Sequence, residues 1–180
     1  ILSGDVEGAH LQVTSALFGF VYIPFFLSYL VFIRLVEIRG VEILLLVGIS
    51  VALSDVLAFA VGSLVGGPPL APNVSPNKTW AGLGGNLLGA FAGWALMWFA
   101  IPDEWSVTTR IIAPTVVALA AVWGDLIESF FKRDFEVKDA GDLLPGFGGL
   151  LDRIDSLLVA LPISYYAIVI TQHFTVGPGG

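Results

Sequence analysis

The chain has 180 residues, of which 56% are hydrophobic and only 13% are charged, and it contains no cysteine. Soluble domains carry roughly 45–50% apolar and about 25% charged residues. This composition therefore excludes an ordinary soluble globule, a disordered chain and a disulfide-stapled secreted module. The formal net charge of −7 argues against nucleic acid as a partner, because phosphate backbones are bound by Lys and Arg.

Five stretches are long and apolar enough to cross a bilayer as helices, which takes about 20 residues each. In chain order they cover residues 11–33, 41–65, 83–101, 111–131 and 151–174. The expected fold class is therefore all-α: a polytopic integral membrane protein with about five transmembrane helices in this chain.

The loops between these spans differ in charge. The loops at residues 67–80 and 132–150 must share one side of the membrane, and they hold Lys78, Lys132, Arg133 and Lys138. The other side holds Arg34, Arg39 and Arg110. The positive-inside rule places the first set of loops in the cytoplasm.

Charge is concentrated between residues 125 and 155, which hold eight of the fifteen acidic and four of the eight basic residues. A solvated loop accounts for Asp134, Glu136 and Asp142. It does not account for Asp125, Glu128, Asp152 and Asp155, which lie within or at the ends of predicted spans. A carboxylate at membrane depth costs on the order of 2.5–3.5 kcal/mol, so it normally faces a polar interior with a partner.

The spacing of these carboxylates indicates a metal site. Asp125 and Ser129 are four residues apart, and Asp152 and Asp155 are three apart, so each pair shares one helical face. Two antiparallel helices can bring the faces together around one polar pocket. Hard oxygen ligands of this kind suit Mg²⁺. The alternative is a structural ion-pair network with Lys132, Arg133 and Arg153.

Cations and glycines follow the carboxylates closely. Lys132, Arg133 and Lys138 can contact phosphate. The run Pro-Gly-Phe-Gly-Gly at residues 145–149 precedes the last span, and the backbone N–H groups of Gly148 and Gly149 can face an anion at a helix start. Metal, cations and backbone donors together predict a phosphoryl or nucleotidyl transfer site.

Two polar positions upstream are open to more than one interpretation. Lys78, in Ser-Pro-Asn-Lys-Thr-Trp at residues 75–80, can bind phosphate, or this segment can simply anchor the chain at the membrane surface through Trp80. Asp55 lies inside an apolar span. It can join the predicted pocket, pair with Lys78, or form a helix-packing polar pair with Ser54.

The run from Ser129 to Asp155, with its Lys-Arg, Lys-Asp, Pro-Gly-Phe-Gly-Gly and Asp-Arg-Ile-Asp elements, resembles the pattern of phosphatidate cytidylyltransferases, or CDP-diacylglycerol synthases. Residues 75–80 and the region of Asp55 are similar to two further segments of that family, so the resemblance covers about residues 14–174. It implies that residues 1–180 form a single membrane-embedded catalytic domain without the N-terminal helices of full-length members. Residues 67–80 and 132–150 are then its cytoplasmic active-site loops.

The resemblance also implies a reaction of phospholipid biosynthesis. CMP is transferred from CTP to phosphatidate, giving CDP-diacylglycerol and pyrophosphate, with Mg²⁺ as cofactor and K⁺ as a second ion. By position, the implied metal ligands are Asp125, Ser129, Asp152 and Asp155. The implied nucleotide-binding residues are Lys78, Lys132, Arg133, Lys138, Gly148 and Gly149. The implied catalytic residues are Asp125, Lys132, Arg133, Lys138, Asp139, Asp152 and Asp155, with Asp139 orienting Lys138 or a metal-bound water. The family further implies a homodimer in the cytoplasmic membrane of a prokaryote.

One departure and three alternatives accompany this hypothesis. Phe147 stands where the family has His, and Phe cannot donate a hydrogen bond or carry a proton. A CTP-dependent enzyme on another lipid, such as a CDP-archaeol synthase or a polyprenol kinase, is the nearest alternative. An inactive remnant that binds nucleotide or lipid is the second. The third is a transporter or channel with Asp55, Asp125, Asp152 and Asp155 along a cation path.

Overall fold

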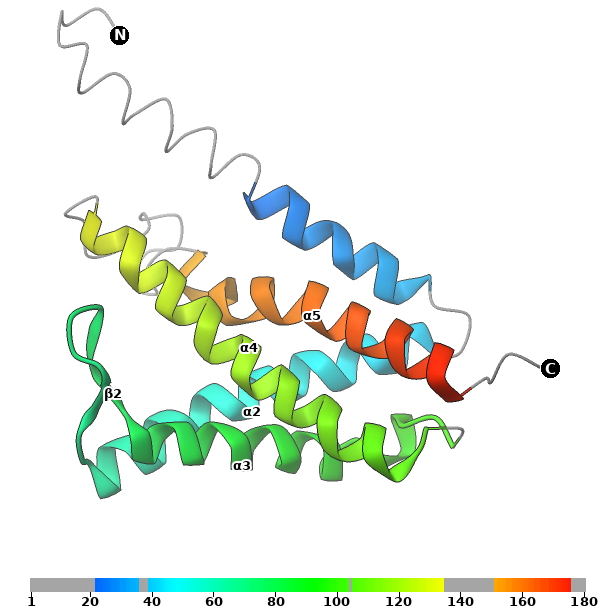
Figure 1. Ribbon diagram of the computed structural model, residues 1–180, viewed down its shortest axis with the longest axis horizontal. Coiled ribbons are helices and arrows are strands. Elements are labelled where there is room, and N and C mark those ends of the chain that lie inside the picture. The colour runs from blue at the N-terminus through cyan, green and yellow to red at the C-terminus, as the bar shows by residue number, and fades with distance from the viewer. Residues whose placement is uncertain (1–21, 36–38, 104, 135–150, 176–180) are drawn as a thin grey trace, which may run out of the picture.

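The structure is a computed structural model that describes residues 22–35, 39–103, 105–134 and 151–175. Its long elements are an N-terminal helix over Tyr22–Arg34, α2 (Gly40–Val65), α3 (Trp80–Leu96), α4 (Val107–Asp134) and α5 (Leu151–Thr175) (Figure 1). Short elements are the strands β1 (Pro69–Ala71) and β2 (Ser75–Thr79) and a 3₁₀ turn over Trp98–Ala100. The five predicted helices are therefore present.

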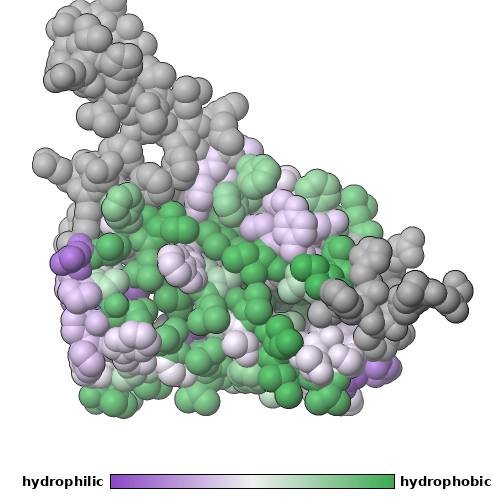
Figure 2. Space-filling model, viewed as in Figure 1, coloured by the Kyte–Doolittle hydropathy of each residue, from purple (hydrophilic) through white to green (hydrophobic). Residues whose placement is uncertain are grey.

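Two of the described helices have the length of a membrane span, and apolar side chains lie on the outside of the bundle. Helix α2 and the segment Val107–Phe130 of α4 are each long and apolar enough to cross a bilayer. With 26 residues, α2 is about 39 Å long, more than the hydrocarbon core of about 30 Å. Its outer side chains are apolar, and Phe59 and Leu64 are 78% and 85% exposed. Hydrophobic side chains also cover much of the face shown in Figure 2. The predicted helical membrane fold is confirmed.

Helices α2 and α3 pack through glycines on one face of α3. A Cβ at Gly85 or Gly89 would overlap the carbonyl oxygens of Leu57 and Leu53, and one at Gly93 would lie 2.7 Å from the Cα of Ser50. Small residues at such an interface allow two helix backbones to approach closely. This close approach holds α2 and α3 side by side along the base of the molecule in Figure 1.

Gly89→Ala is expected to lower the free energy of unfolding by about 1–3 kcal/mol, the usual cost of overpacking a filled interface. Gly84→Ala is the matched control, because a Cβ there meets nothing within 4 Å. The control is expected to leave stability unchanged or to raise it by up to about 1 kcal/mol through helix propensity. Thermal unfolding of both variants in the same detergent measures the difference. Equal midpoints would show that the two helices do not need this contact.

The segment expected as a loop at residues 67–80 is instead a β-hairpin followed by the start of α3. Strands β1 and β2 pair antiparallel, with Pro69 opposite Thr79 and Ala71 opposite Ser75. Helix α3 begins at Trp80, three residues before the predicted start. Its cap explains why: the Thr79 Oγ1 accepts a hydrogen bond from the Gly82 backbone N–H at 3.0 Å.

The boundaries of α4 also differ from the prediction. The helix begins at Val107 rather than residue 111, because the Ser106 hydroxyl accepts a hydrogen bond from the Thr109 N–H at 3.2 Å. It continues to Asp134, so the predicted loop at 132–150 has helical backbone over its first three residues.

Two of the three arginines predicted on the far side of the membrane bind backbone carbonyls at one end of the bundle. Arg39 donates to the Phe99 carbonyl at 2.8 Å, and Arg110 donates to the Trp105 carbonyl at 3.1 Å. The start of α2 and the end of α3 therefore share this end. The hairpin, which carries Lys78, joins the opposite ends of the same two helices.

Candidate active site

Three carboxylates meet where α4 packs against α5. Asp125 and Glu128 lie on α4 and Asp155 lies on α5, and one oxygen from each lies within 4.8 Å of the others. The two helices come close because Gly124 has no side chain: a Cβ there would lie 3.0 Å from the Cα of Ser156. Glu128 and Asp155 are each only 8% exposed. We call Asp125, Glu128 and Asp155 the carboxylate triad.

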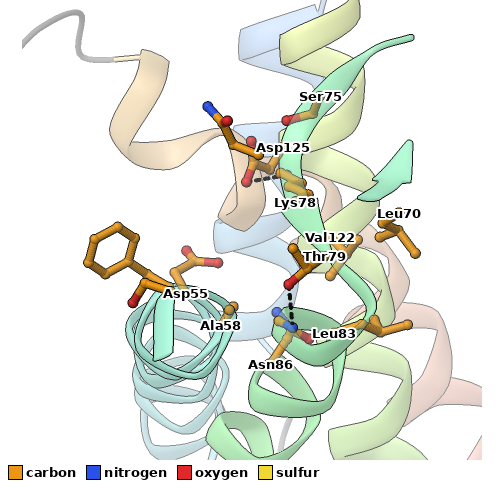
Figure 3. Close-up of a pocket in the computed structure, with 15 residues that line it drawn as sticks. Asp55, Ala58, Leu70, Ser75, Lys78, Thr79, Leu83, Asn86, Val122 and Asp125 are labelled. Carbon is orange, nitrogen blue, oxygen red and sulfur yellow. Dashed lines mark hydrogen bonds and ion pairs between the residues drawn. The ribbon is translucent and has the colours of Figure 1, made fainter. Parts of the chain in front are cut away.

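The β-hairpin brings a cation to this triad. Lys78 on β2 forms an ion pair with Asp125, as the dashed line in Figure 3 shows. The Lys78 side chain is 22% exposed, so the pair is shielded but still accessible. The arrangement places a positive charge and three carboxylates around one position, which is the combination that binds a metal and a phosphate together.

A cavity of about 500 Å³ opens beside the ion pair. Its walls come from α2, the hairpin, α3 and α4. Its charged and amide-bearing lining residues are Asp55, Asn77, Lys78, Asn86 and Asp125, and part of its apolar wall is Ala58, Leu83 and Val122 (Figure 3). The cavity has the size and the mixed lining of a small-molecule site.

Asp55 joins this cavity. The Ser156 hydroxyl on α5 donates a hydrogen bond to the Asp55 Oδ1 at 3.4 Å, which links α2 to the helix that carries Asp155. Lys78 pairs with Asp125 and not with Asp55. The proposed polar pair with Ser54 is wrong, because the buried Ser54 hydroxyl has no hydrogen-bond partner among the described residues.

The structure describes some of the predicted site residues in full, some by their backbone only and others not at all. It brings Asp125, Asp155 and Lys78 together, and Ser129 lies half-buried one residue beyond Glu128 on α4. Lys132 and Arg133 lie in the last turn of α4 and Asp152 in the first turn of α5, where the structure describes the backbone only. The remaining predicted residues lie outside the described residues: Lys138, Asp139, Phe147, Gly148 and Gly149.

Three residues of the site are missing from the predicted set. Glu128 belongs to the triad, and its signal was its spacing of three from Asp125 inside an apolar span. Asn86 stands out as an amide within a glycine-rich apolar helix. Ser156 has no sequence signal beyond its place after Asp155.

Residues 2–171 match the model of the cytidylyltransferase family. This chain belongs to that family. The predicted family and its enzyme class, nucleotidyltransferase, are thereby confirmed at the level of the family. The assignment favours an enzyme over a transporter or channel.

Curated relatives of this family member are bacterial enzymes named phosphatidate cytidylyltransferase. The relative from Rickettsia bellii (strain RML369-C) is 36% identical over 173 residues, which cover 92% of this chain and 74% of the relative. The relative from Brucella abortus (strain 9-941) is 44% identical over 62% of this chain and 41% of its own length. The relative from Haemophilus influenzae is 40% identical over 71% of this chain and 46% of its own length. The chain thus spans less than half of the last two relatives.

Among solved structures, an intramembrane enzyme for archaeal membrane lipid biosynthesis aligns with 69% of this chain and 77% of its own chain. Its sequence identity is 24% and the TM-score is 0.47.

Proposed function

We propose that this chain transfers CMP from CTP to phosphatidate, giving CDP-diacylglycerol and pyrophosphate. The observation that carries the proposal is the carboxylate triad beside Lys78, at the edge of a cavity in a membrane-embedded helical bundle. The names of the bacterial relatives support phosphatidate as the acceptor. This reaction needs little covalent chemistry from the protein, which has to position two anionic substrates and offset their charge.

The residues present fit the Mg²⁺ that the family implies. Three carboxylates with oxygens within 4.8 Å of one another are hard donors on two different helices. Asp125, Glu128 and Asp155 would hold the ion, with Ser129 and Asp152 as further candidates by position. When bound, Mg²⁺ supplies charge neutralisation at the triphosphate and at the leaving pyrophosphate.

In the proposed reaction, a phosphate oxygen of phosphatidate attacks the α-phosphorus of CTP. A new P–O bond forms to the lipid phosphate, and the bond between the α-phosphorus and the bridging oxygen breaks, so pyrophosphate leaves with its electron pair. Lys78 would contact the phosphates as a point charge. Lys132, Arg133 and Lys138 are proposed to add further cationic contacts, the N–H groups of Gly148 and Gly149 to face the phosphates, and Asp139 to orient Lys138.

The proposal also covers the membrane in which the enzyme lies and the side that its active site faces. The lysines of the hairpin and of the loop after α4 support an active site that faces the cytoplasm. The bacterial relatives support a location in the cytoplasmic membrane. A bound K⁺ and a homodimer are proposed on the family resemblance.

The reconstituted protein is expected to release pyrophosphate from CTP only when phosphatidate and Mg²⁺ are both present, with CDP-diacylglycerol as the lipid product by mass spectrometry. Asp103→Asn, in the exposed turn at the opposite end of the bundle, is the control and should match the parent protein. Product formed only with a different lipid acceptor would change the substrate.

Phe147→His belongs in the same assay, because His is the family residue at that position. Turnover by the variant alone would show that Phe147 makes the chain inactive as it stands. No turnover by either protein would contradict the proposal.

A further inference from the structure

Tyr22 has no task in the reaction described above. It lies in the first turn of the N-terminal helix, inside a predicted membrane span, and its side chain is half-buried. A tyrosine hydroxyl in such a place normally has a hydrogen-bond partner, because an O–H group without one is costly in an apolar setting. The surroundings of this hydroxyl follow from the way the N-terminal helix packs.

The N-terminal helix packs alongside α5 through aromatic rings. The ring centroid of Tyr29 lies 5.7 Å from that of Tyr165 and 5.9 Å from that of Tyr166. The hydroxyls of Tyr29 and Tyr166 are 3.2 Å apart. The two helices run in the same direction in Figure 1. A residue nearer the start of the N-terminal helix therefore faces a residue nearer the start of α5.

This register directs Tyr22 toward the carboxylate triad. Tyr22 precedes Tyr29 by two turns on the same helical face, which places it about 10.5 Å nearer the start of its helix. Asp155 precedes Tyr165 by about 15 Å along α5. Side chains on a helix lean toward its N-terminus, so the long side chain of Tyr22 leans toward Asp155.

Electrostatic and packing contacts agree with this placement. The charges of Asp155 and Glu128 both act on the Tyr22 hydroxyl. The ring of Tyr22 packs on Phe26, with ring centroids 4.7 Å apart. Tyr22 does not line the cavity beside Lys78, so it approaches the triad from the side of the N-terminal helix.

A neutral hydroxyl is suited to a carboxylate that holds a metal ion. A carboxylate that ligates Mg²⁺ through one oxygen can accept a hydrogen bond on the other, and that bond fixes its orientation. A phenol donates such a bond at neutral pH without adding a charge to the site. Removal of an outer partner of this kind typically costs about 10–100-fold in metal affinity or activity.

We propose that Tyr22 is a positioning residue of the metal site, whose hydroxyl donates a hydrogen bond to the carboxylate triad from the side of the N-terminal helix. It holds Glu128 and Asp155 in the orientation that the strict octahedral geometry of Mg²⁺ requires, and it does not itself touch the ion. This inference rests on the metal site of the proposed function, and it adds the N-terminal helix to the elements that build that site.

Tyr22→Phe tests the role of the hydroxyl, because the variant keeps the ring that packs on Phe26. Binding of Mn²⁺ is measured by electron paramagnetic resonance without substrate, and binding of Mg²⁺ and Ca²⁺ by competition with Mn²⁺. The variant is expected to bind Mn²⁺ and Mg²⁺ about tenfold more weakly. Ca²⁺ accepts irregular geometry and should lose less than about threefold. A purely structural role of Tyr22 would not produce this difference between ions.

Two other tyrosines provide matched controls. Tyr29→Phe and Tyr166→Phe each remove one hydroxyl from the pair that joins the same two helices. Both share the chemical change of Tyr22→Phe, but they lie farther from the triad along their helices. Each is expected to bind Mn²⁺ within about twofold of the parent protein. Thermal unfolding of all three variants without metal reports any loss of packing separately.

Mn²⁺ binding by Tyr22→Phe within about twofold of the parent would overturn the inference, whatever the rate of turnover. An equal loss in Tyr29→Phe, or an equal loss for Mg²⁺ and Ca²⁺, would also overturn it, because helix packing would then be the cause. Failure of the parent protein itself to bind Mn²⁺ would instead contradict the metal site of the proposed function.

Discussion

Asp155→Asn is expected to reduce Mg²⁺-dependent CMP transfer at least about 100-fold. Asp155 is only 8% exposed, and one of its carboxylate oxygens lies within 4.8 Å of an oxygen of Asp125 and of Glu128. A bound metal supplies several kcal/mol of transition-state stabilisation, and each 1.36 kcal/mol is a factor of ten in rate. The amide keeps the shape of the side chain but removes the charge that holds the ion.

The measurement has two parts. Turnover is followed at increasing Mg²⁺, and binding of Mn²⁺ in place of Mg²⁺ is followed by electron paramagnetic resonance without substrate. Glu128→Gln should show the same double loss, because Glu128 completes the triad. Asp103→Asn, the same chemical change in the exposed turn, should show neither. A rate for Asp155→Asn within a few-fold of the parent, with unchanged Mn²⁺ binding, would remove Asp155 from the metal site.

The carboxylate triad was predicted only in part from helical spacing. Asp125 and Asp155 were identifiable because a carboxylate in an apolar span needs a polar partner. Their meeting also depends on Gly124, which allows α5 to approach α4, and that role of a glycine is visible only once both helices are placed. Glu128 has the same kind of signal as Asp125, yet spacing alone did not decide between Glu128 and Ser129 as the companion of Asp125.

The β-hairpin was not predicted from the sequence. Residues 67–80 are rich in proline and lack the alternation that predicts strands, so a loop was expected. Strands β1 and β2 form a two-stranded sheet, and Pro76 is tolerated because such a sheet consists of edges. The order in this segment matters for the site, since β2 carries Lys78 to Asp125.

Asn86 illustrates a limit of a different kind. An amide in a membrane helix can face a neighbouring helix, a cavity or the lipid interface, and its sequence position does not choose among them. The packing of Gly85 and Gly89 against α2 fixes which face of α3 is buried, and Asn86 then lies at the cavity with an unpaired oxygen. The place of Asn86 in the fold could therefore not be predicted from the sequence.

Lys78→Met is expected to raise the KM for CTP about 10–100-fold, because a hydrogen bond from a charged group contributes about 1.5–3 kcal/mol. Met keeps the length of the side chain and removes its charge. Lys78→Arg, the matched variant, keeps the charge and should recover part of the loss. Steady-state kinetics at saturating phosphatidate and Mg²⁺ measure the effect.

The alternative for Lys78 is a purely structural role as the ion-pair partner of Asp125. The two roles predict different effects of Lys78→Met on CTP affinity and on Mg²⁺ binding. If Lys78 serves only Asp125, Lys78→Met leaves the KM for CTP unchanged and tightens Mg²⁺ binding in the absence of nucleotide, because Asp125 no longer shares its charge with an ammonium group. If Lys78 binds phosphate, the affinity for CTP falls whatever happens to Mg²⁺ alone. Calorimetric titration of Mg²⁺ without nucleotide, beside the kinetic assay, therefore decides whether the hairpin lysine belongs to the substrate or to the scaffold.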